Sequence, residues 1–320
     1  ELDRAVARLQ DEGMTRLLLD LRGNPGGLLD QAVKVSERFI PAGEKVVYTR
    51  GRIPGSNQDF LAKRGVDRID VPVVLLVDGS SASASEIVSG AIQDHDRGLV
   101  VGETTFGKGL VQRVIPLRDG GALAVTTAKY YTPAGRLIQR DYSDLEQYYL
   151  SRPDDEPEVF DVESEEIPGD ATEIFYTDAG RRVYGGGGIR PDHIVKAERA
   201  PQVMIGLIRE SLLFDFAVRY IDAHPDIEPG FPADEALMAE FKAFMKEREH
   251  KYDAEAFEED IDAIKIRLRA QISRVKWNAI EEARVLAEAD PQVQEALKLF
   301  DEAAKLANIV EPPGESRRSL

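Results

Sequence analysis

A serine-rich turn holds the first residues of this chain whose types and spacing could do chemistry. Residues 79–86 read GSSASASE and lie between the apolar run VPVVLLVD and the segment IVSGAIQDH. A helix that begins here would present unpaired backbone N–H groups and a partial positive charge to one of its serines. That position suits a serine nucleophile and the oxyanion that its attack creates. The alternative is a well-capped helix, in which Ser83 and Glu86 form a capping box. If Ser83 is the nucleophile, Ser80 and Ser81 are the expected caps.

Lys108 is the residue best placed in the sequence to activate a serine. It stands in the glycine-flanked stretch ETTFGKG, and its neighbours Phe106 and Leu110 are apolar. Burial there would favour the neutral amine that a general base requires. If residues 108–112 are extended, Lys108 and Gln112 share a face, and Gln112 can hold the lysine by a hydrogen bond. The alternative is an ordinary lysine at the end of a loop.

A glycine-rich turn, GNPGG at residues 23–27, follows the apolar run LLLDLR. Its backbone N–H groups are exposed to a ligand, and one of them could supply half of an oxyanion hole. Pro25 cannot donate, so Gly26 or Gly27 is the candidate, and we assign Gly26. The alternatives are a tight strand–helix connection or a phosphate loop. Neither of the two common glycine-rich nucleotide-binding patterns is present, so nucleotide binding is not expected.

The composition excludes several other kinds of chemistry. The chain has no cysteine, which rules out disulfides, cysteine catalysis and cysteine-ligated zinc. Its four histidines are scattered without metal-binding spacing, so we expect no metal and no other cofactor. A net charge of −17 argues against nucleic acid as a partner. The apolar share of 42% is enough for real cores, and no apolar run approaches the roughly 20 residues of a membrane span.

The hydrophobic pattern alternates between strand-like and helical periods through the first 139 residues. This order implies an α/β core with largely parallel strands. The expected elements are helices within 2–13, 28–39 and 82–95, strands within 14–22, 44–50, 71–78 and 98–103, a polar loop at 51–65 and a hairpin at 110–135.

The composition changes after this core. From Asp141 to Asp170 the chain is acidic and weakly periodic, which predicts a solvated insertion at about 141–175. From about Ala200 onward the pattern is helical. We therefore expect two domains, a core at 1–199 and a helical C-terminal region at 200–320.

In their order along the chain, the glycine-rich turn, the serine-rich turn and the lysine loop resemble the S41 family of carboxyl-terminal-processing (tail-specific) proteases, which are Ser-Lys peptidases. The resemblance implies a ClpP/crotonase-like α/β core that needs no cofactor. The stretches that carry it lie within residues 1–195 and read LLLDLRGNPGGLL, GSSASASEIVSGAIQDHDRGLVVGETTFGKGLVQ, TTAKYYTPAGRLIQ and GGGGIRPD.

The resemblance also assigns roles to residues of this sequence. Ser83 and Lys108 match the family's nucleophile and base in their separation of 25 residues. Asp94 lies about three helical turns beyond Ser83, roughly 16 Å along the helix axis, so we expect it to act as structural support. The implied site consists of Ser83 as nucleophile, Lys108 as base, Gln112 as the residue that holds the lysine, Ala84 and Gly26 as oxyanion donors, and Asp94 as support.

The implied function is that of a serine endopeptidase that cleaves protein or peptide substrates near their C-termini through an acyl-enzyme. The alternative is a non-catalytic peptide- or ligand-binding module on the same core. Members of the family carry an export signal and a PDZ domain, and neither pattern precedes Glu1. We therefore expect a core fragment whose full-length protein carries an N-terminal PDZ domain and is periplasmic or otherwise exported. The helical region is expected to serve assembly into a homo-oligomer.

Overall fold

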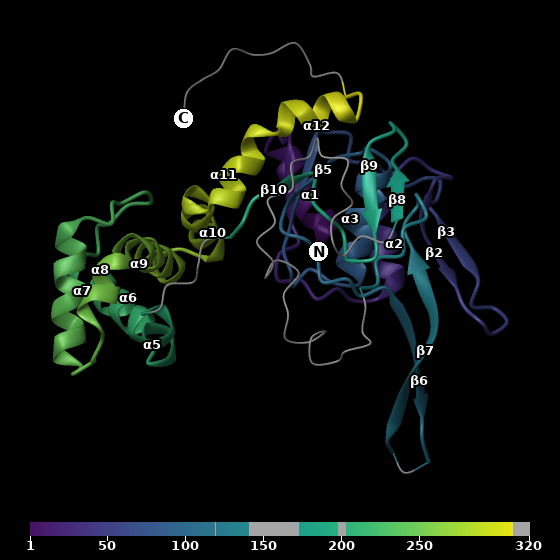
Figure 1. Ribbon diagram of the computed structural model, residues 1–320. Helices are drawn as coiled ribbons and strands as arrows, with labels where there is room; N and C mark the ends of the chain where they lie inside the picture. The colour runs from purple at the N-terminus through teal and green to yellow at the C-terminus, as the bar shows by residue number, and fades with distance from the viewer. Residues whose placement is uncertain (119, 141–172, 198–202, 310–320) are drawn as a thin grey trace. The chain divides into compact units, whose positions relative to one another are not determined.

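The computed structural model describes residues 1–118, 120–140, 173–197 and 203–309. Most of the acidic insertion expected at about 141–175 lies outside these residues. The chain forms two compact units, one made of residues 1–196 together with those from 295 onward, the other of residues 197–294. The last described helix, α12 (Phe300–Leu306), therefore belongs to the first unit (Figure 1). The expected domain boundary at 199/200 remains a prediction.

A parallel sheet forms the centre of the first unit, with strand order β1-β4-β5-β10. Every residue of β4 is buried, which is the pattern of a central parallel strand covered on both faces. The prediction of an α/β core is confirmed, but the expectation of largely parallel strands was wrong, because the two other sheets of this unit pair antiparallel. The strands and the accompanying helices are β1 (Leu17–Asp20), β4 (Val73–Val77), β5 (Leu99–Gly102), β10 (His193–Ile194), α1 (Leu2–Asp11), α2 (Leu29–Ser36) and α3 (Ala84–Asp94).

An antiparallel sheet of order β3-β2-β7-β6 and a two-stranded sheet, β8-β9, complete the first unit. β3 falls in the stretch expected to be a polar loop, and that prediction was wrong. Its backbone pairs with β2, and pairing of this kind overrides weak local preference. The predicted hairpin is confirmed as β6-β7. The strands are β2 (Lys45–Arg50), β3 (Gln58–Leu61), β6 (Leu110–Pro116), β7 (Ala122–Tyr131), β8 (Glu173–Tyr176) and β9 (Arg182–Gly185).

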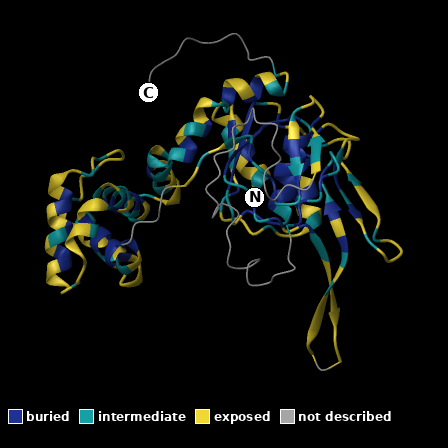
Figure 2. Cartoon of the chain, viewed as in Figure 1, coloured by how far each residue is buried: buried dark blue, intermediate teal, exposed yellow. Residues whose placement is uncertain are grey.

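The second unit is helical, as predicted, and has an apolar core of its own. Phe216, Phe241 and Phe257 are among its fully buried side chains, and its exposed residues lie on the outer faces of the helices (Figure 2). None of its core residues belongs to the core of the first unit. Its helices are α5 (Met204–Arg209), α6 (Leu212–Ala223), α7 (Glu235–Glu247), α8 (Ala254–Glu259), α9 (Ile261–Lys276) and α10 (Ala279–Ala289), and α11 (Pro291–Lys298) follows them.

Candidate active site

Ser83 occupies the sharp turn between the buried strand β4 and helix α3. It is the N-cap residue of α3, and its φ of 55° places a non-glycine residue in the left-handed region. Strain of this kind costs about 1–3 kcal/mol and persists only where surrounding contacts impose it. A strand–turn–helix with a strained serine is a typical way to present a nucleophile. The expectation that Ser80 or Ser81 caps the helix was wrong.

The neighbouring serines attach this turn to the glycine-rich turn. The Ser81 hydroxyl donates to the carbonyl of Leu21 at 2.8 Å, and the Ser85 hydroxyl donates to the carbonyl of Asn24 at 3.0 Å. The backbone N–H of Ala82 donates to the same Asn24 carbonyl at 3.1 Å. These two hydroxyls therefore have structural partners, which leaves Ser80 and Ser83, and of these two Ser83 is the residue at the N-terminus of α3.

The glycine-rich turn runs directly against the first turn of α3. A Cβ placed on Gly26 would lie 2.5 Å from the Ala82 carbonyl oxygen and 2.7 Å from the Ala84 nitrogen. Gly26 also has a φ of 93°, which an L side chain rarely adopts. Only glycine therefore allows this turn to approach the amide of Ala84.

The amide of Gly26 itself is already engaged. It donates to Oδ1 of Asn24 at 2.9 Å, which closes a local turn. Within the described part of the chain, the N–H groups of Gly27 and Ala84 make no hydrogen bond. Gly26 and Gly27 are the two candidate oxyanion donors in the sequence. Of these two, Gly27 is therefore the residue whose N–H can donate to a ligand.

Glu86 connects the serine turn to the lysine loop. Its carboxylate is fully buried and accepts hydrogen bonds from the N–H of Ser83 at 2.7 Å and from the Thr105 hydroxyl at 2.6 Å. It also accepts from the N–H groups of Gly107 at 2.7 Å and Lys108 at 2.9 Å. Burial raises the pKa of Glu86, and these four donors partly offset that rise.

The hydrogen bonds between Glu86 and the lysine loop could not be predicted from the sequence. Its spacing from Ser83 suggested a capping-box acid, and the bond to the Ser83 N–H agrees with that. Spacing carries no signal for the bonds to residues 105–108, because they depend on where the loop after β5 returns. One carboxylate thus fixes the backbone of Ser83 and that of Lys108 relative to each other.

Lys108 lies just before β6, and its side chain is exposed. The expectation that apolar neighbours bury it was therefore wrong for the described residues. Its backbone is well held, since the N–H donates to Glu86 and the carbonyl accepts from the Tyr130 hydroxyl. Gln112 is exposed on β6 opposite Thr126, and no described hydrogen bond joins its side chain to Lys108.

Asp94 lies at the opposite end of α3 from Ser83 and is buried. Its Oδ1 accepts from Nη2 of the buried Arg136 at 2.5 Å, and its Oδ2 accepts from the N–H of Ala134 at 2.8 Å. These bonds attach the turn after β7 to the end of the helix. The contacts of Asp94 are thus structural ones.

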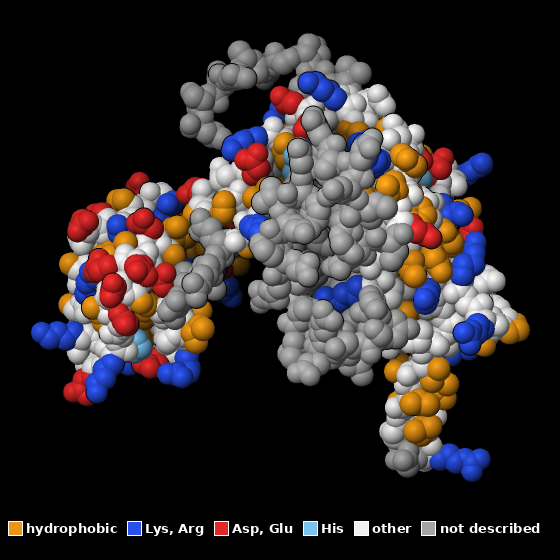
Figure 3. Space-filling view, in the orientation of Figure 1, with side chains coloured by type: hydrophobic (Ala, Val, Ile, Leu, Met, Phe, Trp, Pro, Cys, Tyr) orange, Lys and Arg blue, Asp and Glu red, His pale blue; other side chains and the backbone are white. Residues whose placement is uncertain are grey.

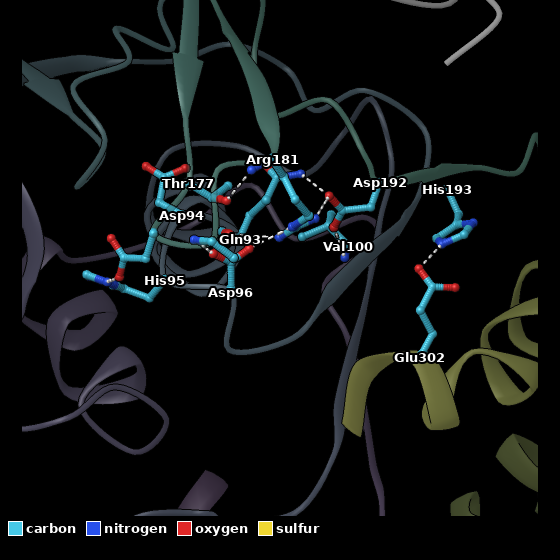
Figure 4. A network of polar contacts seen from close by, with 12 residues as sticks. Gln93, Asp94, His95, Asp96, Val100, Thr177, Arg181, Asp192, His193 and Glu302 are labelled. Atoms are coloured by element: carbon cyan, nitrogen blue, oxygen red, sulfur yellow. Dashed lines mark hydrogen bonds and ion pairs between the residues drawn. The ribbon is translucent and has the colours of Figure 1, made fainter. Parts of the chain in front are cut away.

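A further polar network fastens the segment around β8-β9 and β10 to the same end of α3 (Figure 4). Arg181 bonds Asp96 at 2.6 Å and Asp192 at 2.5 Å, and Asp192 accepts from the N–H of Val100 on β5 at 2.8 Å. Gln93 also donates to Asp192 at 3.0 Å. The network holds the far end of α3 and leaves the Ser83 end to the contacts described above.

Each histidine contacts the carboxylate of a different acidic residue. His193, for example, lies 3.0 Å from Glu302. Over the described ranges no group of three or more His, Asp or Glu side chains could hold a metal ion. In the same ranges no helix has the length and apolar character that crossing a membrane requires.

Two family models match the chain. Residues 1–144 match peptidase family S41, and residues 203–265 match the model described as "Probable PDZ-protease, C-terminal helical domain". Residues 1–144, less than half of the chain, are therefore similar to peptidase family S41, and the relatives that they match are carboxyl-terminal-processing proteases.

Individual relatives agree with this assignment. The carboxy-terminal-processing protease of Bartonella bacilliformis is 50% identical over 133 residues, which are 42% of this chain and 30% of the relative. The chloroplastic carboxyl-terminal-processing peptidase 1 of Arabidopsis thaliana is 40% identical over 129 residues, 40% of this chain and 26% of the relative. The chain thus matches less than a third of the length of these relatives.

A solved structure of a photosystem II D1 C-terminal processing protease is also similar, with 39% sequence identity and a TM-score of 0.38. The match covers 42% of this chain and 35% of that one.

Proposed function

We propose that this chain carries the catalytic core of a serine endopeptidase that uses Ser83 and Lys108 as a dyad. The observation that carries the proposal is the buried Glu86 carboxylate, which bonds the backbone of both residues. The match of residues 1–144 to peptidase family S41 supports it, because both residues lie within the matched range. The chain spans only part of its relatives, so the activity of the whole protein is part of the proposal.

The reaction proceeds through an acyl-enzyme. The neutral amine of Lys108 removes the hydroxyl proton of Ser83 while Oγ attacks the carbonyl carbon of the scissile peptide bond. The C–N bond then breaks, and Lys108 returns the proton to the departing amine. Water, activated by the same lysine, hydrolyses the ester and restores Ser83.

The N–H groups of Ala84 and Gly27 stabilise the oxyanion of the tetrahedral intermediate. Both belong to backbone that the close approach of Gly26 brings together, and neither has another described partner. Preorganised donors of this kind are worth about 3–4 kcal/mol each to the transition state. The assignment of Gly26 as donor is thereby replaced by Gly27, with Gly26 as the residue that permits the approach.

Lys108 acts as a base once substrate covers it. A bound chain removes water from the exposed amine and favours its neutral form. Gln112, on the strand that begins next to the lysine, then directs the amine toward Ser83 by a hydrogen bond. Asp94 supports the other end of α3.

The remaining features of the proposal follow from the family. Substrates are proteins or peptides cut near their C-termini, no nucleic acid is involved, and no cofactor is required. The full-length protein carries an N-terminal PDZ domain and works in the periplasm or another exported compartment. Residues 1–199 form the protease core, and the helical region at 200–320 serves homo-oligomer formation.

The test is cleavage of an unfolded protein by the chain and by two variants. Ser83→Ala and Lys108→Ala should each reduce cleavage by a factor of about a thousand or more, because each removes a member of the dyad. Far-UV circular dichroism should show the fold retained in both. Full activity of the Ser83→Ala variant would overturn the proposal.

A non-catalytic binding module on the same core is the competing function. A serine-reactive acylating probe separates the two, because a binding module would not label at Ser83. A site that depends on the rest of the full-length protein would label only when that part is restored.

A further inference from the structure

The lysine loop, residues 103–109, joins the buried strand β5 to the β6-β7 hairpin. The hairpin extends away from the body of the first unit (Figure 1), and apolar side chains lie open on its visible surface (Figure 3). Val114, at 66% of full exposure, and Leu123, at 53%, are examples. An element with so little buried surface has low local stability and cannot fix the segment at its base. The position of Lys108 must therefore depend on other contacts.

The backbone N–H groups of the lysine and of its two neighbours all have acceptors. Those of Gly107 and Lys108 donate to the Glu86 carboxylate at 2.7 and 2.9 Å. That of Gly109 donates to Oε1 of Gln139 at 2.9 Å. Gln139 is 6% exposed, and its Nε2 donates to the backbone carbonyl of the next residue at 2.8 Å. Its amide group is thus held in one orientation, with the oxygen toward the lysine loop.

The three carbonyl groups of the same residues have donors as well. The Gly107 carbonyl accepts from the N–H of Arg140 at 3.1 Å. The Lys108 carbonyl accepts from the Tyr130 hydroxyl, and the Gly109 carbonyl accepts from the Tyr130 N–H at 3.0 Å. Tyr130 lies near the end of β7 and is 3% exposed. Loops usually turn their backbone groups to water, so complete bonding over three loop residues indicates a segment held in one conformation.

The glycines on either side of the lysine allow the segment of Gln139 and Arg140 to pack directly on the loop. A Cβ on Gly107 would lie 3.0 Å from the Cβ of Arg140, and Gly107 has a φ of 84°. A Cβ on Gly109 would lie 2.9 Å from the nitrogen of Gln139 and 3.1 Å from its Cβ. A side chain at either position would force the two segments apart. The pattern Gly-Lys-Gly thus permits close contact of backbone with backbone.

The side chain of Lys108 contrasts with its backbone. Gly107 and Gly109 are buried, whereas the lysine between them is exposed. The hydrogen bonds of Tyr130 and Gln139 to the loop go to backbone atoms and leave the amine free to meet a substrate. A fixed backbone limits the positions that the amine can reach. This matters for a general base, because it must come within hydrogen-bond reach of the proton that it removes.

We propose that Tyr130 and Gln139 are positioning residues for Lys108. Tyr130 holds the carbonyl of the lysine and Gln139 holds the N–H that follows it, while Glu86 holds the N–H of the lysine itself. Together these contacts set the direction of the lysine Cα–Cβ bond. The proposal rests on the function proposed above, because it requires Lys108 to act as the base. It gives the stretch TTAKYYTPAGRLIQ, which contains both residues, a function in the site.

Tyr130→Phe tests the first contact, because it removes the hydroxyl and keeps the ring. The readout is labelling of Ser83 by a small acylating probe, measured over a range of probe concentrations. The limiting rate at saturation should fall about tenfold, the value of one hydrogen bond. The concentration that gives half of this rate should not change, because the alignment of a base affects the chemical step and not binding. An unchanged limiting rate would overturn the role of Tyr130.

Substitutions of Gln139 test the second contact. Gln139→Leu removes the acceptor of the Gly109 N–H and should slow acylation about tenfold, whereas Gln139→Glu retains an acceptor at the same length and should lose less. If Gln139→Leu does not fold, Gln139→Glu and Tyr130→Phe decide the question. Equal rates for the unaltered chain and the folded Gln139 variants would overturn the role of Gln139.

Gln93→Leu is the matched control for Gln139→Leu. Gln93 is also buried, and its side chain donates to the Arg190 carbonyl at 2.9 Å and to Asp192 at 3.0 Å, at the far end of α3. Its loss should lower the free energy of unfolding but leave acylation unchanged at temperatures where the chain is folded. Equal slowing by both leucine variants would show a general loosening of the fold and overturn the proposal.

A double-mutant cycle with Lys108→Ala shows whether these residues act through the lysine. In a chain that carries Lys108→Ala, adding Tyr130→Phe or Gln139→Leu should not slow the residual labelling of Ser83 any further, because the base that they position is absent. Equal slowing with and without the lysine would overturn the proposal.

Amide hydrogen exchange, measured by NMR, separates this proposal from the proposed function. The amides of residues 107–109 should be protected in the unaltered chain, and Gln139→Leu should speed exchange of the Gly109 amide about tenfold. Unprotected amides in a chain whose labelling of Ser83 depends on Lys108 would reject the positioning role alone. Protected amides in a chain whose labelling does not depend on Lys108 would reject the catalytic function and the positioning role with it.

Discussion

At Ser83 the left-handed backbone is maintained by contacts within residues 81–86 and between these residues and residues 21–24. The N–H of Ser83 donates to the Glu86 carboxylate. The Ser85 hydroxyl, in the helix that follows, donates to the Asn24 carbonyl, and the Ser81 hydroxyl, in the turn itself, donates to the Leu21 carbonyl. These bonds compensate a strain of about 1–3 kcal/mol. A strained nucleophile held this way is aligned before substrate arrives, which is the source of electrostatic preorganisation.

Gly26→Ala should both destabilise the chain and reduce acylation of Ser83. The added Cβ would meet the Ala82 oxygen and the Ala84 nitrogen, and φ is unfavourable, so the loss in unfolding free energy should be about 1–3 kcal/mol. Urea unfolding and the rate of acylation by a small probe measure the two effects.

Gly27→Ala is the matched control for stability. A Cβ on Gly27 meets nothing within 4 Å, and its φ is not in the left-handed region. Its unfolding free energy should therefore change by less than about 1 kcal/mol. Equal destabilisation by both alanines would contradict the close approach described for Gly26.

The sequence predicted the types of the site residues but not how their side chains are arranged. Ser83, Ala84 and the glycine-rich turn were predicted to act together, and the structure brings these three together. Two features did not follow: the engagement of the Gly26 amide by Asn24, and the exposure of Lys108. Both depend on side-chain contacts formed only in the folded chain, and residue spacing carries no information about them.

At the scale of elements, contacts at both ends fix the position of helix α3. Its N-terminal end presents Ser83, and its C-terminal end is fixed by the buried pair of Asp94 and Arg136. A buried ion pair stabilises little in net terms, but removing one partner leaves a charge that water cannot reach. The pair therefore specifies the position of the helix more than it adds stability.

Arg136→Met should lower the unfolding free energy by about 3–5 kcal/mol, because Asp94 would remain buried and unpaired. Arg8→Met in α1 is the control, since the pair of Arg8 with Glu12 is exposed and should contribute less than about 1 kcal/mol. Urea denaturation of both variants measures the difference. A loss for Arg136→Met as small as that for the control would show that the pair does not hold the helix.

Glu86 predicts a pH dependence of stability that the Glu86→Gln variant would lack. Burial raises the pKa of Glu86 above its ordinary value of 4.5 in the folded chain, so the folded state binds the proton more tightly than the unfolded state. Its contribution is fully present below pH 4.5 and is lost as pH rises through the folded pKa. The stability of the unaltered chain relative to Glu86→Gln should therefore fall as pH rises from acid toward neutral. Urea unfolding at a series of pH values tests this, and a rise instead would mean that the four hydrogen bonds outweigh burial.

The elements with a strong hydrophobic period were predictable, and the weak ones were not. β4 and the helix after it have continuous apolar or helical patterns, and both occur as predicted. β3 has only four residues, mostly exposed, and exists because β2 lies beside it. A strand that forms because a neighbouring strand pairs with it has only a weak hydrophobic pattern in its own sequence.

At the scale of the whole molecule, the chain contains two units with separate apolar cores. The change from alternating strands and helices to helices alone predicted domains at 1–199 and 200–320, and those bounds remain a prediction. The sequence could not predict that the last described helix belongs to the first unit, because helical spacing alone does not show which core a helix faces.

Phe241→Ala should destabilise the helical unit by about 3–5 kcal/mol, because it removes a fully buried ring that packs edge-on against Phe216. Trp277 is the chain's one tryptophan and lies at the end of α9, so its fluorescence reports on that unit. Acylation of Ser83 reports on the other unit and should keep its rate at temperatures where both are folded. An unshifted Trp277 transition would contradict the helical core as described.

The central claim is that Ser83 is a nucleophile activated by Lys108, and mass-spectrometric mapping of an acylating probe tests it most directly. The unaltered chain should carry the label on Ser83 and not on Ser81 or Ser85, whose hydroxyls have structural partners. Lys108→Ala should reduce the labelling rate by a factor of about a thousand. Labelling at another serine, or labelling of Ser83 that does not depend on Lys108, would contradict the account.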